Sequence, residues 1–282
     1  FEFSSNTILV QSVYDSYKSN PKQFVDRINS YGLNKPLGLP IKGEGIPVIP
    51  QPGTNRWSGV ALPWMAFGYG LSVTPLQTLT LYNAVANDGV MVKPIFVSEI
   101  KEWNKTIKKY NTEVINPKIC SQETLDKVQA VLENVVKKGT GSKLYSKDFS
   151  MAGKTGTAQV NYKDKSKLYY ASSFVGYFPA DEPKYSCIIV VHKPNVAAGY
   201  YGADVAGPVF KRIAQKIFTD SPSTNHVKNI DAKVVSQETN YKEFYKKAEK
   251  AENEGRIVPN VRGMSGMDAV ALLENLGLNV KV

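Results

Sequence analysis

Residues 151–160 read MAGKTGTAQV, and the five residues from Gly153 to Thr157 decide how the chain is interpreted. One interpretation is a phosphate-binding P-loop, which requires the pattern GxxxxGK[ST]. The first glycine of that pattern would fall at position 148, which is Asp148. A P-loop also opens a helix whose N-terminus faces the phosphate, whereas the residues after Thr157 continue as a strand-like run. Both observations argue against a nucleotide site, and a turn without function remains one alternative.

The other interpretation is the KTG strand of serine acyl-transferases that act on penicillins and peptidoglycan stem peptides. Lys154 would place a cation beside the reacting centre, and the hydroxyls of Thr155 and Thr157 would bind a substrate carboxylate. Gly156 has no side chain, so a substrate could lie along the strand edge as an added strand. The backbone N–H of Thr157 could supply half of an oxyanion hole. This interpretation makes Lys154 catalytic and the three following residues substrate-binding.

An enzyme of this kind needs two further motifs, SxN and SxxK. Ser4-Ser5-Asn6 fits SxN directly before a predicted helix, which makes Ser4 and Asn6 catalytic candidates. The same tripeptide pattern is common in helix caps, and it recurs at residues 223–225.

SxxK occurs twice, at residues 19–22 and 98–101. The function requires both side chains on one face of a first helical turn, so that the amine can deprotonate the hydroxyl. Pro21 lies inside the first match and suits a surface helix start. The second match lies in a strand-like run, where residues three apart face opposite sides. We therefore expect the nucleophile upstream of Phe1, and we expect the 282-residue chain alone to be inactive.

Composition narrows the remaining function classes. The net charge of +10 lies within residues 1–218, because the rest of the chain holds nine basic and nine acidic residues. A basic body suits an acidic partner such as a membrane surface or a carboxylate-bearing polymer. No basic stripe with interleaved aromatic residues is present, so we expect no nucleic-acid partner. With two histidines and two cysteines, the chain has no metal-ligand spacing, and we expect neither metal nor cofactor.

Hydrophobic periodicity predicts the main elements. The predicted helices are residues 7–31, 121–138 and 207–218, together with a helix that starts at Thr74-Pro75-Leu76-Gln77 and ends at Gly89. In that helix Leu76, Leu79 and Ala86 lie on one face. In the helix 121–138, Leu125, Val128, Leu132 and Val135 point inward. The predicted strands are residues 151–160, 171–178 and 185–192, and residues 101–109 look like an exposed hairpin. Because the strands have short connections, we expect antiparallel pairing. The fold class is therefore α/β of the α+β type, an antiparallel sheet flanked by helices.

Composition also divides the chain. Residues 1–218 form the folded body, residues 219–256 a polar linker, and residues 257–282 a small folded module.

At this point residues 1 to about 218 resemble the class B penicillin-binding proteins of the division-specific type. SxN and KTG occur in the family's order, and five further strings match it: RWS at 56–58, FGYGLSVTPLQ at 67–77, ANDG at 86–89, SFVGYFPA at 173–180 and YYG at 200–202. The tail from Val258 resembles the first part of a PASTA repeat. The resemblance implies a β-lactamase-like transpeptidase fold.

The resemblance also implies a mechanism. An upstream serine would attack a stem peptide ending in D-Ala-D-Ala, with Ser4 relaying a proton to the leaving amine, Asn6 holding an amide, and Thr155 and Thr157 holding the carboxylate. β-Lactam antibiotics would acylate the same serine. The implied partners are a division-associated glycosyltransferase and other membrane division proteins. The implied location is the cell membrane, with an upstream N-terminal anchor and an extracytoplasmic catalytic domain. A D,D-carboxypeptidase, a β-lactamase and a non-catalytic peptidoglycan sensor or scaffold remain alternatives.

Overall fold

A computed structural model describes residues 1–161, 164, 166–220 and 273. The chain divides into two units, Phe1–Ser221 and Pro222–Val282, and the elements below belong to the first. Apart from residues 219, 220 and 273, the predicted linker and PASTA-like module lie outside the described residues, and both stay predictions.

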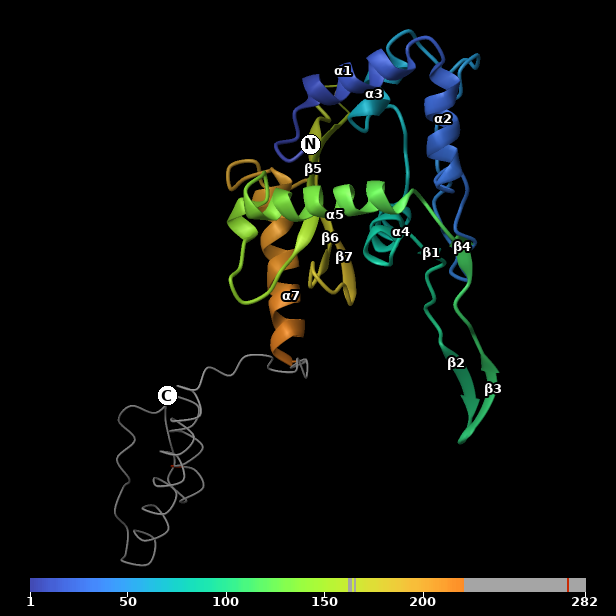
Figure 1. Cartoon of the computed structure of the whole chain (residues 1–282), viewed down its shortest axis with the longest axis vertical. Helices are drawn as coiled ribbons and strands as arrows, with labels where there is room; N and C mark the ends of the chain where they lie inside the picture. Colours follow the sequence, from blue (N-terminus) through green and yellow to red (C-terminus); the bar gives the residue numbers. More distant parts are fainter. Residues whose placement is uncertain (162–163, 165, 221–272, 274–282) are drawn as a thin grey trace, which may run out of the picture. The chain divides into compact units, whose positions relative to one another are not determined.

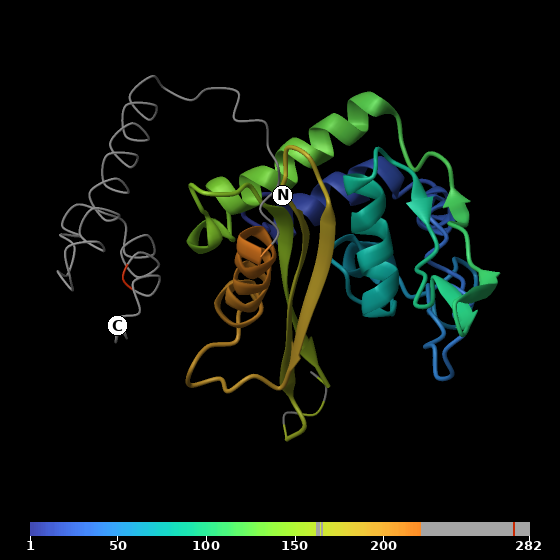
Figure 2. The same cartoon turned by 90° about the horizontal axis from the view of Figure 1, so that it is seen from below.

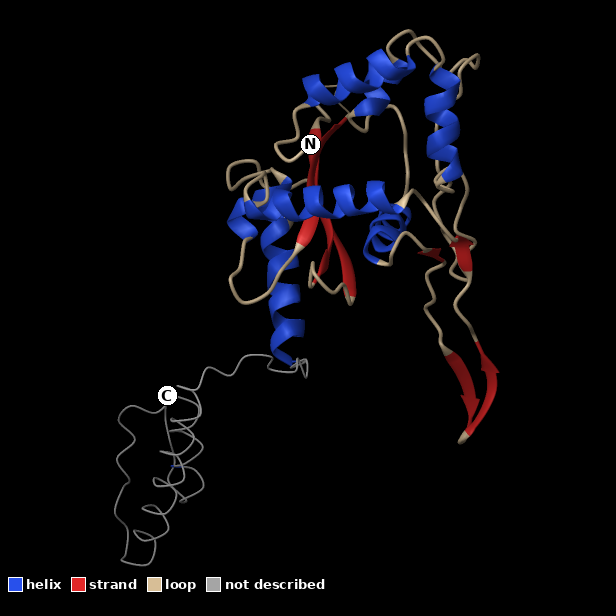
Figure 3. Cartoon of the chain, viewed as in Figure 1, coloured by secondary structure: helices blue, strands red, loops and turns tan. Residues whose placement is uncertain are grey.

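A three-stranded antiparallel sheet carries the KTG residues (Figure 3). Its strands are β5 (Ala152–Val160), β6 (Tyr169–Phe178) and β7 (Tyr185–His192), in the order β5-β6-β7. All three predicted strands and their antiparallel pairing are confirmed. In the register, Lys154 lies opposite Val175 and Gly156 opposite Ser173. Strand β5 is an edge strand of this sheet, so within the described residues one side of its backbone is not paired with another strand.

Helices cover both faces of this sheet, with α7 on one side and α4 on the other (Figure 2). The face toward α6 (Gly202–Val205) and α7 (Gly207–Asp220) buries Phe174 completely, with its ring 4.7 Å from that of Phe210. The opposite face buries Tyr177 in a cluster with Val85 and Leu132. Two apolar layers therefore hold β6, the strand that pairs with the Lys154 strand.

Helix α4 (Pro75–Ala86) begins as predicted, with Thr74 and Gln77 forming a reciprocal capping box. Of the three residues predicted to share a face, Ala86 packs against the cluster that contains Tyr177. Leu76 and Leu79 are only half-buried, whereas the buried positions include Gln77, 1% exposed, and Thr80, 3% exposed. Their polar atoms are satisfied, because Gln77 Nε2 donates to the Lys35 carbonyl and Thr80 Oγ1 donates to the Leu76 carbonyl. A bonded polar side chain can be buried at low cost, which the hydrophobic pattern does not reveal.

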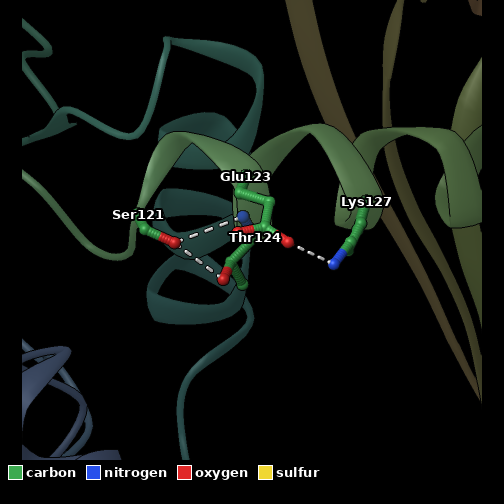
Figure 4. Close-up of polar contacts among 4 residues, drawn as sticks. All are labelled: Ser121, Glu123, Thr124 and Lys127. Carbon is green, nitrogen blue, oxygen red and sulfur yellow. Dashed lines mark hydrogen bonds and ion pairs between the residues drawn. The ribbon is translucent and has the colours of Figure 1, made fainter.

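Helix α5 (Gln122–Lys137) crosses the sheet and is capped by Ser121, whose Oγ accepts the Thr124 N–H at 3.3 Å (Figure 4). Glu123 lies in the first turn and pairs with Lys127 at 2.6 Å. The predicted inward residues Leu125, Leu132 and Val135 are buried. Val128, predicted for the same face, is 36% exposed.

The predicted helix 7–31 is two helices, α1 (Asn6–Tyr17) and α2 (Pro21–Ser30). The break lies at Asn20, whose φ of −147° and ψ of 75° are not helical. The residue before a proline is disfavoured in the α region, so Pro21 starts a new helix. Helix α1 packs against the short helix α3 (Ala61–Ala66) beside the end of β5 (Figure 1).

Short elements complete the unit. They are the pair β1 (Met91–Val92) and β4 (Val114–Asn116), the pair β2 (Glu99–Glu102) and β3 (Lys105–Lys109), and the 3₁₀ turn η1 (Ser142–Leu144). The exposed hairpin predicted for residues 101–109 is confirmed, with Trp103 at its tip 95% exposed. In the part of the chain that the structure describes, no helix is long and apolar enough to cross a membrane.

Candidate active site

The unpaired edge of β5 exposes backbone groups of alternate residues. In an antiparallel ladder, the N–H and C=O of one residue both point to the same neighbour, and the direction alternates along the strand. The N–H of Gln159 donates to the Tyr69 hydroxyl at 2.7 Å and so points away from β6. Gln159 lies opposite Tyr170 in the register. The Tyr170 carbonyl accepts the N–H of Lys193, the residue after β7, at 2.9 Å, so the backbone groups of Tyr170 are likewise turned away from β5. The backbone groups of Thr155 and Thr157 therefore also point outward from the sheet.

Lys154 is partly buried at this edge and contacts neutral acceptors. Its Nζ donates to Ser4 Oγ and, at 3.0 Å, to the Thr155 carbonyl. Among the described residues, no carboxylate lies within 4.0 Å of it. Burial disfavours the ammonium and lowers the pKa of Lys154 to about 8. A lysine of this kind can both donate and accept a proton near neutral pH.

This pKa shift predicts a pH-dependent stability. Because the folded pKa is about 8 and the usual value is 10.5, the unfolded chain binds more protons between these two values, and stability rises with pH across that window. Below about pH 8 the buried ammonium destabilises the fold. We expect Lys154→Met to raise the melting temperature at pH 7, and we expect this advantage to shrink as pH rises from 8 to 10.5. Thermal melts of both proteins across this range check it, and a gap that is constant with pH would contradict the assignment.

The SxN segment is held against β5 by several contacts. Ser4 has a positive φ of 52° and closes a turn through its N–H to the Phe1 carbonyl at 2.9 Å. The Phe1 ring lies 5.7 Å from Lys154 Nζ. Glu2 accepts the Thr140 N–H at 3.1 Å through its carbonyl and pairs with Lys138 at 3.4 Å through its side chain.

The structure brings most of the predicted site residues together. Ser4 touches Lys154, and the Thr155 hydroxyl lies 3.4 Å from Lys154 Nζ. The Thr157 hydroxyl accepts the Gly202 N–H at 3.0 Å. Asn6 opens helix α1 with an exposed side chain, for which the described part of the chain provides no hydrogen-bond partner.

Glycine is required where α6 meets this strand. A Cβ on Gly202 would lie 2.3 Å from the Ser173 carbonyl oxygen and 2.5 Å from that of Gly156. Neither backbone atom can move without disturbing the ladder. The close approach lets the Gly202 N–H donate to the Thr157 hydroxyl, and this hydrogen bond fixes the Thr157 rotamer.

Sequence reasoning missed Thr140. Its hydroxyl lies 2.8 Å from the Thr155 hydroxyl, and its N–H holds the Glu2 carbonyl. It therefore links the SxN segment to the KTG strand. The only signal in the sequence is the string Gly139-Thr140-Gly141 between a helix and a strand, and a Cβ at Gly139 would lie 2.5 Å from the Glu2 carbonyl oxygen.

Both SxxK matches lie away from this edge. Ser19 and Ser98 are exposed, and their lysines are engaged elsewhere, Lys22 with Asp26 and Lys101 with Glu99. Figures 1 and 2 show α2 and the β2–β3 hairpin apart from β5.

Comparison with known proteins identifies the family of the chain. Residues 1–215 match the family described as the penicillin binding protein transpeptidase domain. The chain belongs to this family. It is 30% identical over 259 residues to stage V sporulation protein D of Bacillus subtilis, covering 89% of the chain and 37% of that protein. It is 32% identical over 199 residues to the peptidoglycan D,D-transpeptidase FtsI of Buchnera aphidicola, covering 69% of the chain and 33% of that protein.

A solved structure of the same transpeptidase family matches the fold. Penicillin-binding protein 3 of Mycobacterium tuberculosis superposes with a TM-score of 0.67 at 28% identity, covering 79% of this chain and 51% of that one. The fold is therefore the α+β fold of the penicillin-binding transpeptidases, as the resemblance implied. The chain spans about a third of the length of the two curated relatives.

Proposed function

We propose that this chain is part of a peptidoglycan D,D-transpeptidase, which cross-links stem peptides ending in D-Ala-D-Ala by serine acyl transfer. One observation carries the proposal. Lys154 contacts Ser4 at a strand edge where the backbone of Thr157 points outward. A proton relay and an oxyanion donor therefore lie along one short stretch of strand.

The proposed cycle assigns one role to each group. A serine supplied from outside residues 1–282 attacks the penultimate D-Ala carbonyl, whose oxygen is held by the Thr157 N–H. The C–N bond to the terminal D-Ala breaks, and the proton lost by the attacking serine hydroxyl passes through Ser4, which is bonded to Lys154, to the leaving amine. An amine of a second stem then attacks the ester, the C–O bond to the serine breaks, and the proton lost by that amine restores the serine hydroxyl. Asn6 and the hydroxyls of Thr155 and Thr157 hold the donor peptide.

The partners and location follow as part of the same proposal. β-Lactams would acylate the same serine, and the solved complex of a relative, penicillin-binding protein 3 of Mycobacterium tuberculosis, with aztreonam supports this. We propose membrane anchoring outside this chain, an extracytoplasmic catalytic domain, and cooperation with a division-associated glycosyltransferase. The name of one curated relative, peptidoglycan D,D-transpeptidase FtsI, supports a setting in which peptidoglycan is the substrate.

A two-substrate assay on the full gene product tests the function. A stem pentapeptide ending in D-Ala-D-Ala serves as donor and an amine-bearing stem as acceptor, with products identified by mass spectrometry. Free D-Ala together with a cross-linked product is the expected result. Free D-Ala with a shortened donor alone would indicate a carboxypeptidase, and peptide binding without D-Ala release would indicate a non-catalytic sensor. Either of these outcomes would overturn the proposal.

A further inference from the structure

Tyr69 covers part of the outer edge of β5. Its hydroxyl accepts the Gln159 N–H at 2.7 Å, although the two residues are far apart in the sequence. This N–H is one of the groups that an added strand would use, because it points away from β6. Tyr69 belongs to the string FGYG, to which the proposed reaction assigns no role.

The loop that carries Tyr69 is held in place by its backbone conformation and by packing contacts. Gly68 and Gly70 flank it with φ of 94° and 79°, a conformation that disfavours other residues. The Tyr69 ring packs edge-on against Trp64, with the ring centroids 5.8 Å apart, and at a tilt against Phe67, with the centroids 5.3 Å apart. Just beyond the loop, Val48 and Ser72 form an antiparallel bridge with two hydrogen bonds, whose N···O distances are 2.7 and 2.8 Å. The hydroxyl is therefore aimed at β5 by a rigid support.

A second group covers the edge on the other side of Thr157. The Thr155 carbonyl accepts from Lys154 Nζ at 3.0 Å. Between this carbonyl and the Gln159 N–H, the outward groups of the strand are the N–H and C=O of Thr157. Within the described residues, neither has a hydrogen-bond partner. The open edge is thus one residue long.

We propose that Tyr69 is a specificity-determining residue that ends this edge. It limits the backbone hydrogen bonds between a bound peptide and β5 to those of Thr157. The site therefore accepts the C-terminal end of a peptide, and the preceding residues leave the sheet edge. The cation of Lys154 and the Thr155 hydroxyl attract the terminal carboxylate to one side of Thr157. In an antiparallel added strand, the residues before the carboxylate then run toward Gln159, where Tyr69 stops them. The ligand class rests on the proposed function.

Amide hydrogen exchange tests, without any ligand, whether Tyr69 covers the Gln159 N–H at the edge of β5. We expect Tyr69→Phe to keep the ring packing but to release the Gln159 N–H, which should then exchange with solvent at least tenfold faster. Tyr170→Phe is the matched control, because the Tyr170 hydroxyl contacts the Gln159 side chain at 3.4 Å and not its N–H. Its Gln159 amide should exchange at the wild-type rate. Equal exchange in wild type and Tyr69→Phe would overturn the proposal.

Peptide binding tests the specificity. The probes are acetyl-Lys-D-Ala-D-Ala and the same peptide lengthened by three glycines before the lysine, titrated against the 282-residue chain. Wild type should bind both with affinities within about twofold. Tyr69→Phe should bind the long probe about three- to tenfold more tightly than the short one, since one net hydrogen bond contributes about 0.5–1.5 kcal/mol.

The two experiments separate the possible failures. Fast exchange without a length preference would overturn the specificity proposal while leaving the proposed function intact. If neither probe binds wild type, the proposed ligand class is wrong and the specificity proposal falls with it. The exchange result would still show whether Tyr69 covers the edge.

Discussion

Replacing Lys154 by methionine should lower the rate at which fluorescent penicillin acylates the full gene product by about 10³-fold. A positioned proton-transfer group contributes about 10²–10⁴-fold to a rate. Lys154 is the amine that contacts Ser4, and burial brings its pKa to about 8. Methionine keeps an unbranched side chain, one atom shorter, and removes its ability to transfer a proton. Because we expect this variant to be at least as stable as wild type at neutral pH, the loss should not come from unfolding.

The matched control for this measurement is Lys147→Met. Lys147 is an exposed lysine in the loop before β5, so its removal changes the net charge by the same amount without touching the strand edge. We expect its acylation rate to stay within twofold of wild type. If the acylation rate of Lys154→Met lies within tenfold of the wild-type rate, Lys154 takes no part in the proton transfer and has a structural role only.

Replacing Phe174 by alanine should destabilise the protein by about 3–5 kcal/mol, as is typical of a fully buried phenylalanine. The Phe174 side chain is 0% exposed. Its ring packs against Phe210, and its backbone lies opposite Thr155 in the register. The substitution therefore opens a cavity directly behind the KTG strand. For a unit of this size, the loss corresponds to a fall in melting temperature on the order of 10 °C.

Phe96→Ala is the control for this prediction. Phe96 is 53% exposed, so its loss should change the melting temperature by about 2 °C or less. Calorimetry of the two variants and wild type makes the comparison. A fall in Phe174→Ala no larger than that of Phe96→Ala would show that the layer between the sheet and α7 does not support the strand.

The sheet, its order of elements and most of the site could be predicted because their signals are local. The strand runs that end at Val160, Phe178 and His192 are separated by short polar loops, and such short connections favour antiparallel pairing. The cap at Thr74 depends on residues within one helical turn. The KTG and SxN strings are local as well, and the structure brings Ser4 and Lys154 into contact.

The remaining features depend on contacts between distant segments. The burial of Gln77 depends on the Lys35 carbonyl, and the link between Thr140 and Thr155 depends on how α5 meets the sheet. The role of Tyr69 depends on which way the Gln159 N–H points, which only the strand register sets. The helix break at Asn20 is different, because the proline that causes it is visible in the sequence and outweighs the helical pattern on either side.

We propose that residues 1–282 are one part of a serine acyl-transferase whose nucleophile lies outside them. Intact-mass measurement after incubation with fluorescent penicillin tests it most directly, with residues 1–282 and the full gene product treated side by side. We predict one covalent adduct on the full product and none on residues 1–282. An adduct on residues 1–282 would place the nucleophile inside this chain and contradict the account. The absence of an adduct on both proteins would contradict the proposed enzyme activity itself.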